Sequence, residues 1–157
     1  MHLTPSGFFV TSGKATSRTS DLNAFDNALF NAGISEQNLV AVSSVIPVGA
    51  KECDKKDLPM GAVTHCVLSQ MRGRGGDVIS AGIAYAYRVD GKGGYVAEGK
   101  LFGCEADLRL ELESKMAEMS KMRGIEFGEI RTVAMEHRIP PGEYGCCVAA
   151  LVFTEYG

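Results

Sequence analysis

"NLVAVSSVIPVGA", residues 38–50, interrupts an apolar run with two adjacent hydroxyl side chains, Ser43 and Ser44. The apolar residues on either side predict a strand over residues 38–46, which Pro47 ends. A buried hydroxyl needs a hydrogen-bond partner, so the interior must satisfy both serines. The simpler interpretation is a strand end at which backbone or water does so. The alternative is that the two serines take part in chemistry.

Around this stretch, the sequence predicts strands and a long connection. Apolar runs rich in β-branched and aromatic residues, separated by glycine-containing turns, are typical of strands. The expected strands are residues 7–17 (running into a polar loop), 61–71, 78–88, 94–102, 129–139 and 145–156. Residues 47–60 form a polar connection bounded by prolines, long enough to suggest a functional loop.

Two helices are predicted from apolar residues that recur every three or four positions. The first can be capped by Ser20 or Asp21 and ended by Gly33, and the second runs from Glu105 to Arg123 before Gly124. The expected buried stripes are Leu22, Phe25, Leu29 and Ala32 in the first helix, and Leu108, Leu112, Met116, Met119 and Met122 in the second.

The order of these elements favours an α+β fold. One strand, a helix, several strands, a helix and two strands do not form the regular alternation of a doubly wound sheet. We therefore expect one domain over residues 1–157, with mostly antiparallel β-sheets sandwiched between outer helices, an αββα-type sandwich. A chain of 157 residues is long enough to bury a core of ordinary size.

Composition narrows the class of protein. Hydrophobic residues make up 45% and charged residues 22%, which excludes a disordered chain. The net charge is −3 and basic residues form no block, so nucleic acid is not an expected partner. No apolar run approaches the roughly 20 residues that cross a bilayer, and the first residues do not resemble a secretory signal. Five cysteines without metal-binding spacing favour reduced thiols in the cytoplasm.

The serine pair permits one specific backbone reaction. If the peptide before Ser44 is strained, the Ser44 hydroxyl can attack the carbonyl carbon of Ser43 and convert the amide to an ester. β-Elimination then breaks the chain and leaves dehydroalanine at position 44, which hydrolyses to a ketone, a pyruvoyl group. The chain would gain a covalent electrophile without a diffusible cofactor.

Three separated blocks in the same order resemble the pyruvoyl-dependent arginine decarboxylase family. They are "LNAFDNALFNAG" (22–33), "NLVAVSSVIPVGA" (38–50) and "LPMGA" (58–62), and "GGYVAEGK", "VAMEHR" and "CCVAALVF" extend the similarity over nearly the whole chain. The resemblance implies self-cleavage into a β chain of residues 1–43 and an α chain of residues 44–157 that begins with the pyruvoyl cofactor. It also implies decarboxylation of L-arginine to agmatine and CO₂. The expected assembly is a homotrimer, or a dimer of trimers, with active sites between subunits.

The resemblance also implies roles for individual residues. Glu98 would return a proton to the substrate carbon, and its apolar neighbours at 95–97 would favour the protonated carboxyl. Asp26 would bind the guanidinium group with two carboxylate oxygens. Asn38 would orient the substrate, and Ser43 would become a terminal carboxylate that lines the pocket.

Other interpretations stay open at this point. Glu98 and Asp26 also fit an edge-strand glutamate and a helix aspartate that face water. The enzyme could decarboxylate another amino acid, such as histidine, although Asp26 suits a guanidinium better. An unprocessed homologue could only bind a cationic metabolite or serve as a structural subunit. His65 and His137 are expected to be structural, because no GxSxG turn supports a serine hydrolase. Agmatine would serve polyamine biosynthesis or acid resistance.

Overall fold

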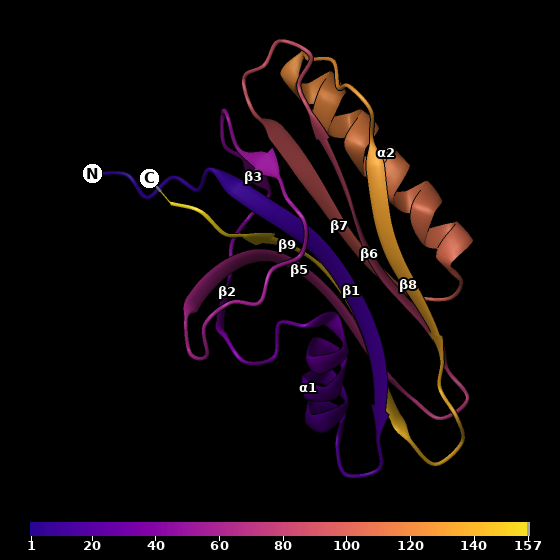
Figure 1. Cartoon of the computed structure of the whole chain (residues 1–157). Coiled ribbons are helices and arrows are strands. Elements are labelled where there is room, and N and C mark those ends of the chain that lie inside the picture. The colour runs from indigo at the N-terminus through magenta and orange to yellow at the C-terminus, as the bar shows by residue number, and fades with distance from the viewer. Residues whose placement is uncertain (157) are drawn as a thin grey trace.

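The chain folds into two β-sheets and two helices, described here for residues 1–156 by a computed structural model (Figure 1). The helices are α1 (Asp21–Ala32) and α2 (Glu105–Arg123). The strands are β1 (Gly7–Ser17), β2 (Asn38–Ala41), β3 (Val45–Ile46), β4 (Lys51–Glu52), β5 (Val63–Arg74), β6 (Val78–Tyr87), β7 (Gly94–Phe102), β8 (Arg131–Arg138) and β9 (Tyr144–Phe153).

The two sheets are mostly antiparallel, which confirms the α+β class. One sheet has five strands in the order β2-β5-β9-β1-β4, and the other has four in the order β3-β7-β6-β8. Among the strands of residues 1–156, only the β1–β4 and β2–β5 pairs are parallel. Large apolar side chains from both sheets, among them Phe8, Ile83, Val96 and Leu151, form one buried cluster. The sheets therefore pack face to face in the manner of a sandwich.

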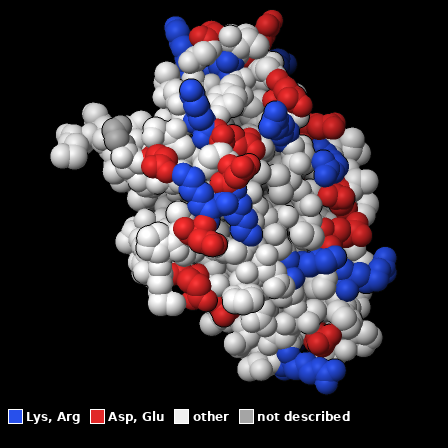
Figure 2. All heavy atoms as spheres, viewed as in Figure 1, with Lys and Arg blue, Asp and Glu red and all other residues white. Residues whose placement is uncertain are grey.

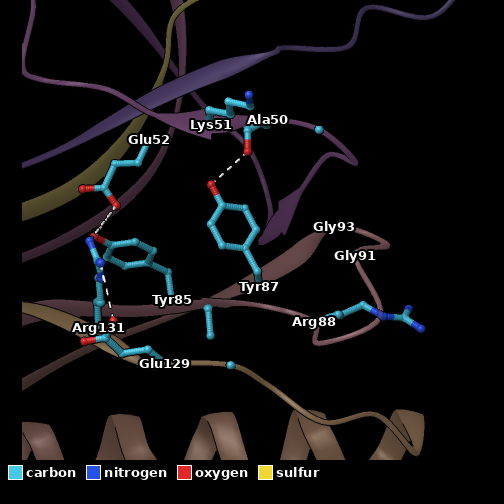
Figure 3. A pocket seen from close by; sticks show the side chains of 13 residues that line it. Ala50, Lys51, Glu52, Tyr85, Tyr87, Arg88, Gly91, Gly93, Glu129 and Arg131 are labelled. Atoms are coloured by element: carbon cyan, nitrogen blue, oxygen red, sulfur yellow. Dashed lines mark hydrogen bonds and ion pairs between the residues drawn. The ribbon is translucent and has the colours of Figure 1, made fainter.

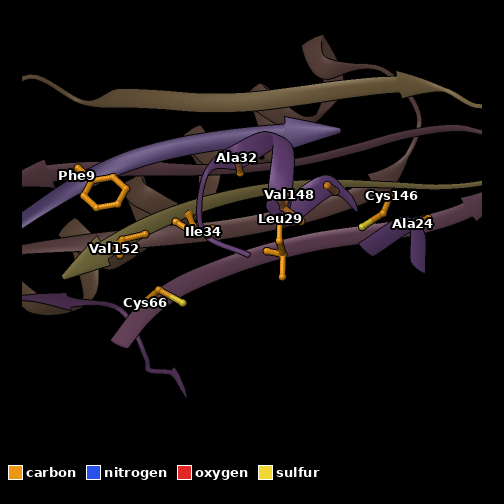
Figure 4. Close-up of a cluster of buried hydrophobic side chains, with 11 residues drawn as sticks. Phe9, Ala24, Leu29, Ala32, Ile34, Cys66, Cys146, Val148 and Val152 are labelled. Atoms are coloured by element: carbon orange, nitrogen blue, oxygen red, sulfur yellow. The ribbon is translucent and has the colours of Figure 1, made fainter. Parts of the chain in front are cut away.

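Helix α1 packs closely on the five-stranded sheet (Figure 4). The Ser20 side chain accepts a hydrogen bond from the Asn23 N–H, and Gly33 ends the helix in the left-handed conformation. A Cβ atom at Gly13 of β1 would lie 2.5 Å from the Ala28 carbonyl oxygen, so glycine is needed for this approach. The expected stripe is wrong at one position, because Leu22 is 62% exposed.

Helix α2 matches its expected bounds and packs on the four-stranded sheet. Its buried residues Leu108, Leu112 and Met116 contact small side chains of the sheet, including Ala84 and Ala97. The expected stripe is too long: Met122 lies outside this cluster and is 83% exposed.

The expected strand over residues 38–46 is wrong. It is divided into β2 and β3, which belong to different sheets, and residues 42–44 connect them. The expected loop of residues 47–60 contains the short strand β4. Pairing partners distant in the sequence decide both departures, since β2 pairs with β5, β3 with β7 and β4 with β1.

Charges of both signs are interspersed over the face seen in Figure 2, without a block of either sign on that face. Within residues 1–156, neither helix has the length and hydropathy that crossing a bilayer requires.

Candidate active site

The serine pair lies where the chain crosses from one sheet to the other. Just before it, the Val42 N–H donates a hydrogen bond to the Cys66 carbonyl oxygen of β5, at 2.9 Å. Just after it, the Val96 N–H of β7 donates to the Ser44 carbonyl oxygen, also at 2.9 Å. The peptide between the two serines is therefore held from both sides by strands of different sheets.

This crossing is open to solvent in the single chain. Ser43 is exposed and Ser44 is partly buried, so the expectation of buried hydroxyls is wrong. Neither serine has a positive φ, since no residue other than glycine in the described chain adopts one. The serines thus show no left-handed backbone strain.

Glu98 lies on the same edge of the molecule as Ser44. It is two residues beyond Val96, whose N–H contacts Ser44, and residues two apart in a strand share a face and lie about 7 Å apart. The neighbouring strand β3 pairs only with Tyr95 and Gly94, so Glu98 belongs to an unpaired edge of β7. Its side chain is exposed, and the expected apolar setting is absent from the single chain.

Two side chains fix the main chain at Glu98. The Lys115 Nζ of α2 donates to the Glu98 carbonyl oxygen at 2.8 Å, and the buried Ser69 Oγ of β5 donates to the Gly99 carbonyl oxygen at 2.5 Å. All four residues line a hollow of about 520 Å³. The sequence analysis missed Ser69 and Lys115, because neither stands in a recognisable motif and their contacts span 30 and 17 residues.

A smaller hollow of about 240 Å³ lies beside the residues that flank the serine pair. Val42 and Val45, which flank the serines, line it together with His65 and Tyr156. The His65 Nδ1 lies 2.6 Å from the Tyr156 hydroxyl, so this ring has a hydrogen-bond partner. Burial raises the pKa of the nearby Cys66 thiol to about 11, which keeps that thiol protonated near neutrality.

His137 lies away from this edge, on β8. Its side chain is buried, and its Nε2 atom has no hydrogen-bond partner in the described part of the chain. Burial lowers the pKa of His137, so its ring is neutral near pH 7.

No hydrogen bond or ion pair within residues 1–156 joins Asn38 or Asp26 to Ser44. Asn38 begins β2, and its Nδ2 donates to the Gly61 carbonyl oxygen at 2.9 Å. Asp26 is exposed on α1 with two apolar side chains, one turn away on either side, that are exposed as well: Leu22 at 62% and Phe30 at 67%. In a single chain, Glu98 therefore lies on the strand β7 that contacts Ser44, whereas Asp26 lies on a separate helix face.

The family match and the most similar relatives described here carry the same description. The family described as pyruvoyl-dependent arginine decarboxylase matches residues 7–157. A pyruvoyl-dependent arginine decarboxylase of Methanothermobacter thermautotrophicus is 37% identical over 147 residues, which cover 93% of this chain and 95% of the relative. Enzymes of the same description from Methanopyrus kandleri and Methanocaldococcus jannaschii are 34% and 37% identical, covering 95% and 82% of this chain and 97% and 78% of the relatives.

Proposed function

Because this chain belongs to the pyruvoyl-dependent arginine decarboxylase family, we propose that it converts L-arginine to agmatine and CO₂. The observation that carries the proposal is the position of Ser43 and Ser44 between the two sheets, on the same edge as Glu98. The reaction is that of a carboxy-lyase, and its product suits polyamine biosynthesis.

The cofactor would come from Ser44 through self-cleavage after Ser43. The hydrogen bonds at Val42 and Ser44 support this proposal, since they hold the two chain segments in place before and after the bond breaks. A pyruvoyl group at residue 44 supplies a ketone that binds the amine of the substrate and accepts the electrons left when CO₂ departs. The exposed side of the serine pair leaves room for the substrate.

Glu98 is the proposed proton donor. It shares an edge of the four-stranded sheet with the Ser44 carbonyl group, and Lys115 and Ser69 hold its stretch of main chain. A carboxyl group fixed at this position can hold a proton and deliver it to the carbon that has lost CO₂. A covering subunit would also exclude water from a carboxyl group that is exposed in the single chain.

We propose that a second copy of the chain supplies Asp26, in a trimer or a pair of trimers. Asp26 stands between Leu22 and Phe30 on an exposed face of α1. The edge that carries the serines is likewise apolar and exposed, at Val40, Val42, Val45, Val48 and Val63. Two different apolar faces on one chain suit a head-to-tail contact, which closes into a ring of three when each copy is rotated by a third of a turn. Asp26 of one copy would then bind the guanidinium group beside Asn38, Ser43 and Ser44 of the next.

Mixed oligomers test this assignment. Asp26→Asn and Glu98→Gln should each be nearly inactive alone, because each lacks one half of the site. Co-expressed in equal amounts, they should recover about one quarter of the parent activity, since one site in four receives both intact residues. Activity would be measured as agmatine formed by the purified mixed oligomer. If Asp26 serves its own chain's Ser44, the mixture will be no more active than its components.

Intact mass tests the self-cleavage. Purified protein should give two species, residues 1–43 and residues 44–157, and the second should be lighter than its sequence predicts because a pyruvoyl group replaces serine. Borohydride should shift only the second species. A single uncut species that still binds arginine would instead support the homologue that only binds a cationic metabolite.

Two further properties follow the same reasoning. We propose the layer order α1, five-stranded sheet, four-stranded sheet, α2, which the contacts of α1 with Phe9 and Val148 and of α2 with Ala84 support. We also propose a cytoplasmic location, in keeping with five cysteines that form no disulfide.

A further inference from the structure

The segment that follows the serine pair, residues 45–52, runs from one sheet to the other. At its start, Val45 and Ile46 pair with β7 at the edge of the four-stranded sheet. At its end, Lys51 and Glu52 pair in parallel with β1 at the far edge of the five-stranded sheet. We call residues 45–52 the end segment. It bears residue 44 at its N-terminal side.

Two tyrosines of β6 hold the second half of the end segment (Figure 3). The Tyr87 hydroxyl donates to the Ala50 carbonyl oxygen at 2.8 Å, and the Tyr85 hydroxyl donates to Glu52 Oε1 at 2.8 Å. Arg131 Nη1 lies 3.8 Å from the same Glu52 oxygen. Burial and the bond to Glu52 raise the pKa of Tyr85, so its hydroxyl remains a donor at any physiological pH.

These contacts border a pocket of about 520 Å³. Neighbouring residues hold the two tyrosine rings and the end segment in place. The Phe8 ring lies against both tyrosines, with centroids 6.0 Å and 6.2 Å away. Gly93 lets the hairpin pass close to the end segment, because a Cβ atom there would lie 2.6 Å from the Ile46 carbonyl oxygen. Tyr87 thus reaches Ala50 from a fixed ring.

Cleavage after Ser43 changes what holds residue 44. In the uncut chain, β2 restrains it from the N-terminal side and the end segment from the C-terminal side. In the cut chain only the hydrogen bond from Val96 to the Ser44 carbonyl oxygen and the end segment remain, and the ladder of this segment with β7 consists of two residues. The hydrogen bond from Tyr87 to Ala50 therefore carries a larger share of the restraint on the reactive chain end after the cut than before it.

We infer that Tyr87, supported by the Tyr85–Glu52 pair, is a positioning residue for the chain end at residue 44. It touches neither the serine pair nor Glu98, and acts by fixing the segment that carries the cofactor. This inference rests on the proposed self-cleavage. It assigns to Tyr87 of β6 a role in catalysis that does not depend on contact with the substrate.

Tyr87→Phe tests the inference, because it removes the hydroxyl and keeps the ring against Phe8. The variant should cut itself at the parent rate and lose about fivefold in kcat/KM for arginine. Hydrogen exchange at residues 45–50 should be faster than in the parent when both are cut. In the uncut Ser44→Ala background, the same substitution should leave the exchange of these residues unchanged.

Tyr144→Phe is the matched control, since its ring lies in β9 and its hydroxyl makes no hydrogen bond within the described chain. It should behave as the parent in every assay. Equal exchange and kcat/KM in cut Tyr87→Phe and cut parent would overturn the inference, as would faster exchange in both backgrounds, which indicates a purely structural role. If Tyr87→Phe does not fold, Tyr85→Phe must show the same pattern. Failure of the proposed function can be told apart from failure of this inference, because in the first case the parent protein itself is uncut or inactive.

Discussion

Ser44→Ala is expected to give one uncut chain of 157 residues that releases no CO₂ from arginine. Without a hydroxyl at position 44, nothing in the backbone can attack the Ser43 carbonyl group, and the ketone never forms. Because the chain on both sides of the serines is held by main-chain hydrogen bonds at Val42 and Val96, the variant should fold normally. Intact mass, the thermal midpoint and CO₂ release would be measured together.

Ser43→Ala provides the control for this variant. The attacked group at position 43 is its carbonyl carbon, which alanine retains, so this protein should still be cut. Cleavage of Ser44→Ala at the same bond would contradict the proposed route. Decarboxylation by an uncut protein would remove the need for a pyruvoyl group altogether.

Glu98→Gln is expected to cut itself normally and to lose about 10²–10⁴-fold in kcat, the usual contribution of a general acid. The amide has the size of the carboxyl group but cannot donate its proton to a carbanion. The main-chain contacts of Lys115 and Ser69 do not involve the Glu98 side chain, so the site should keep its shape. Single-turnover CO₂ release would separate chemistry from product release.

Glu118→Gln makes the same charge change on the exposed face of α2 and should leave kcat unaltered. Normal turnover by Glu98→Gln would remove Glu98 from the role of acid. Loss of self-cleavage in Glu98→Gln would instead assign the carboxyl group to processing.

The sequence predicted the long elements well because their signals are local. Helix α2 has apolar spacing, acidic residues in its first turn and Gly124 after its end, and its bounds agree with the prediction. The division of residues 38–46 could not be predicted in this way. Whether Val45 pairs with the strand beside β2 or with β7 depends on a contact about 50 residues away. Leu22 was misplaced for a related reason: periodicity shows which residues share a helix face, but not how much of that face the sheet covers.

The candidate site followed from the sequence only in part. The serine pair could be recognised as a candidate reactive site from the residues alone. Glu98 and Asp26 were distinguished from ordinary surface carboxylates only by the family resemblance. Tyr87 gave no signal, since a tyrosine in an apolar strand is typical of a core and its partner Ala50 lies 37 residues earlier. Such residues become visible only when the path of the end segment is known.

The ten-residue ladder between β1 and β9 affects whether the cut protein could refold after unfolding. A cut after Ser43 would leave β1, α1 and β2 on a short polypeptide whose partners β9, β4 and β5 all belong to the other one. The uncut precursor folds as a single molecule. Once unfolded, the two cut chains would have to associate before they could refold, and this second step is less favourable and depends on concentration. Unfolding of the cut enzyme by heat or denaturant would therefore be irreversible, and the cell would have to replace the enzyme by new synthesis.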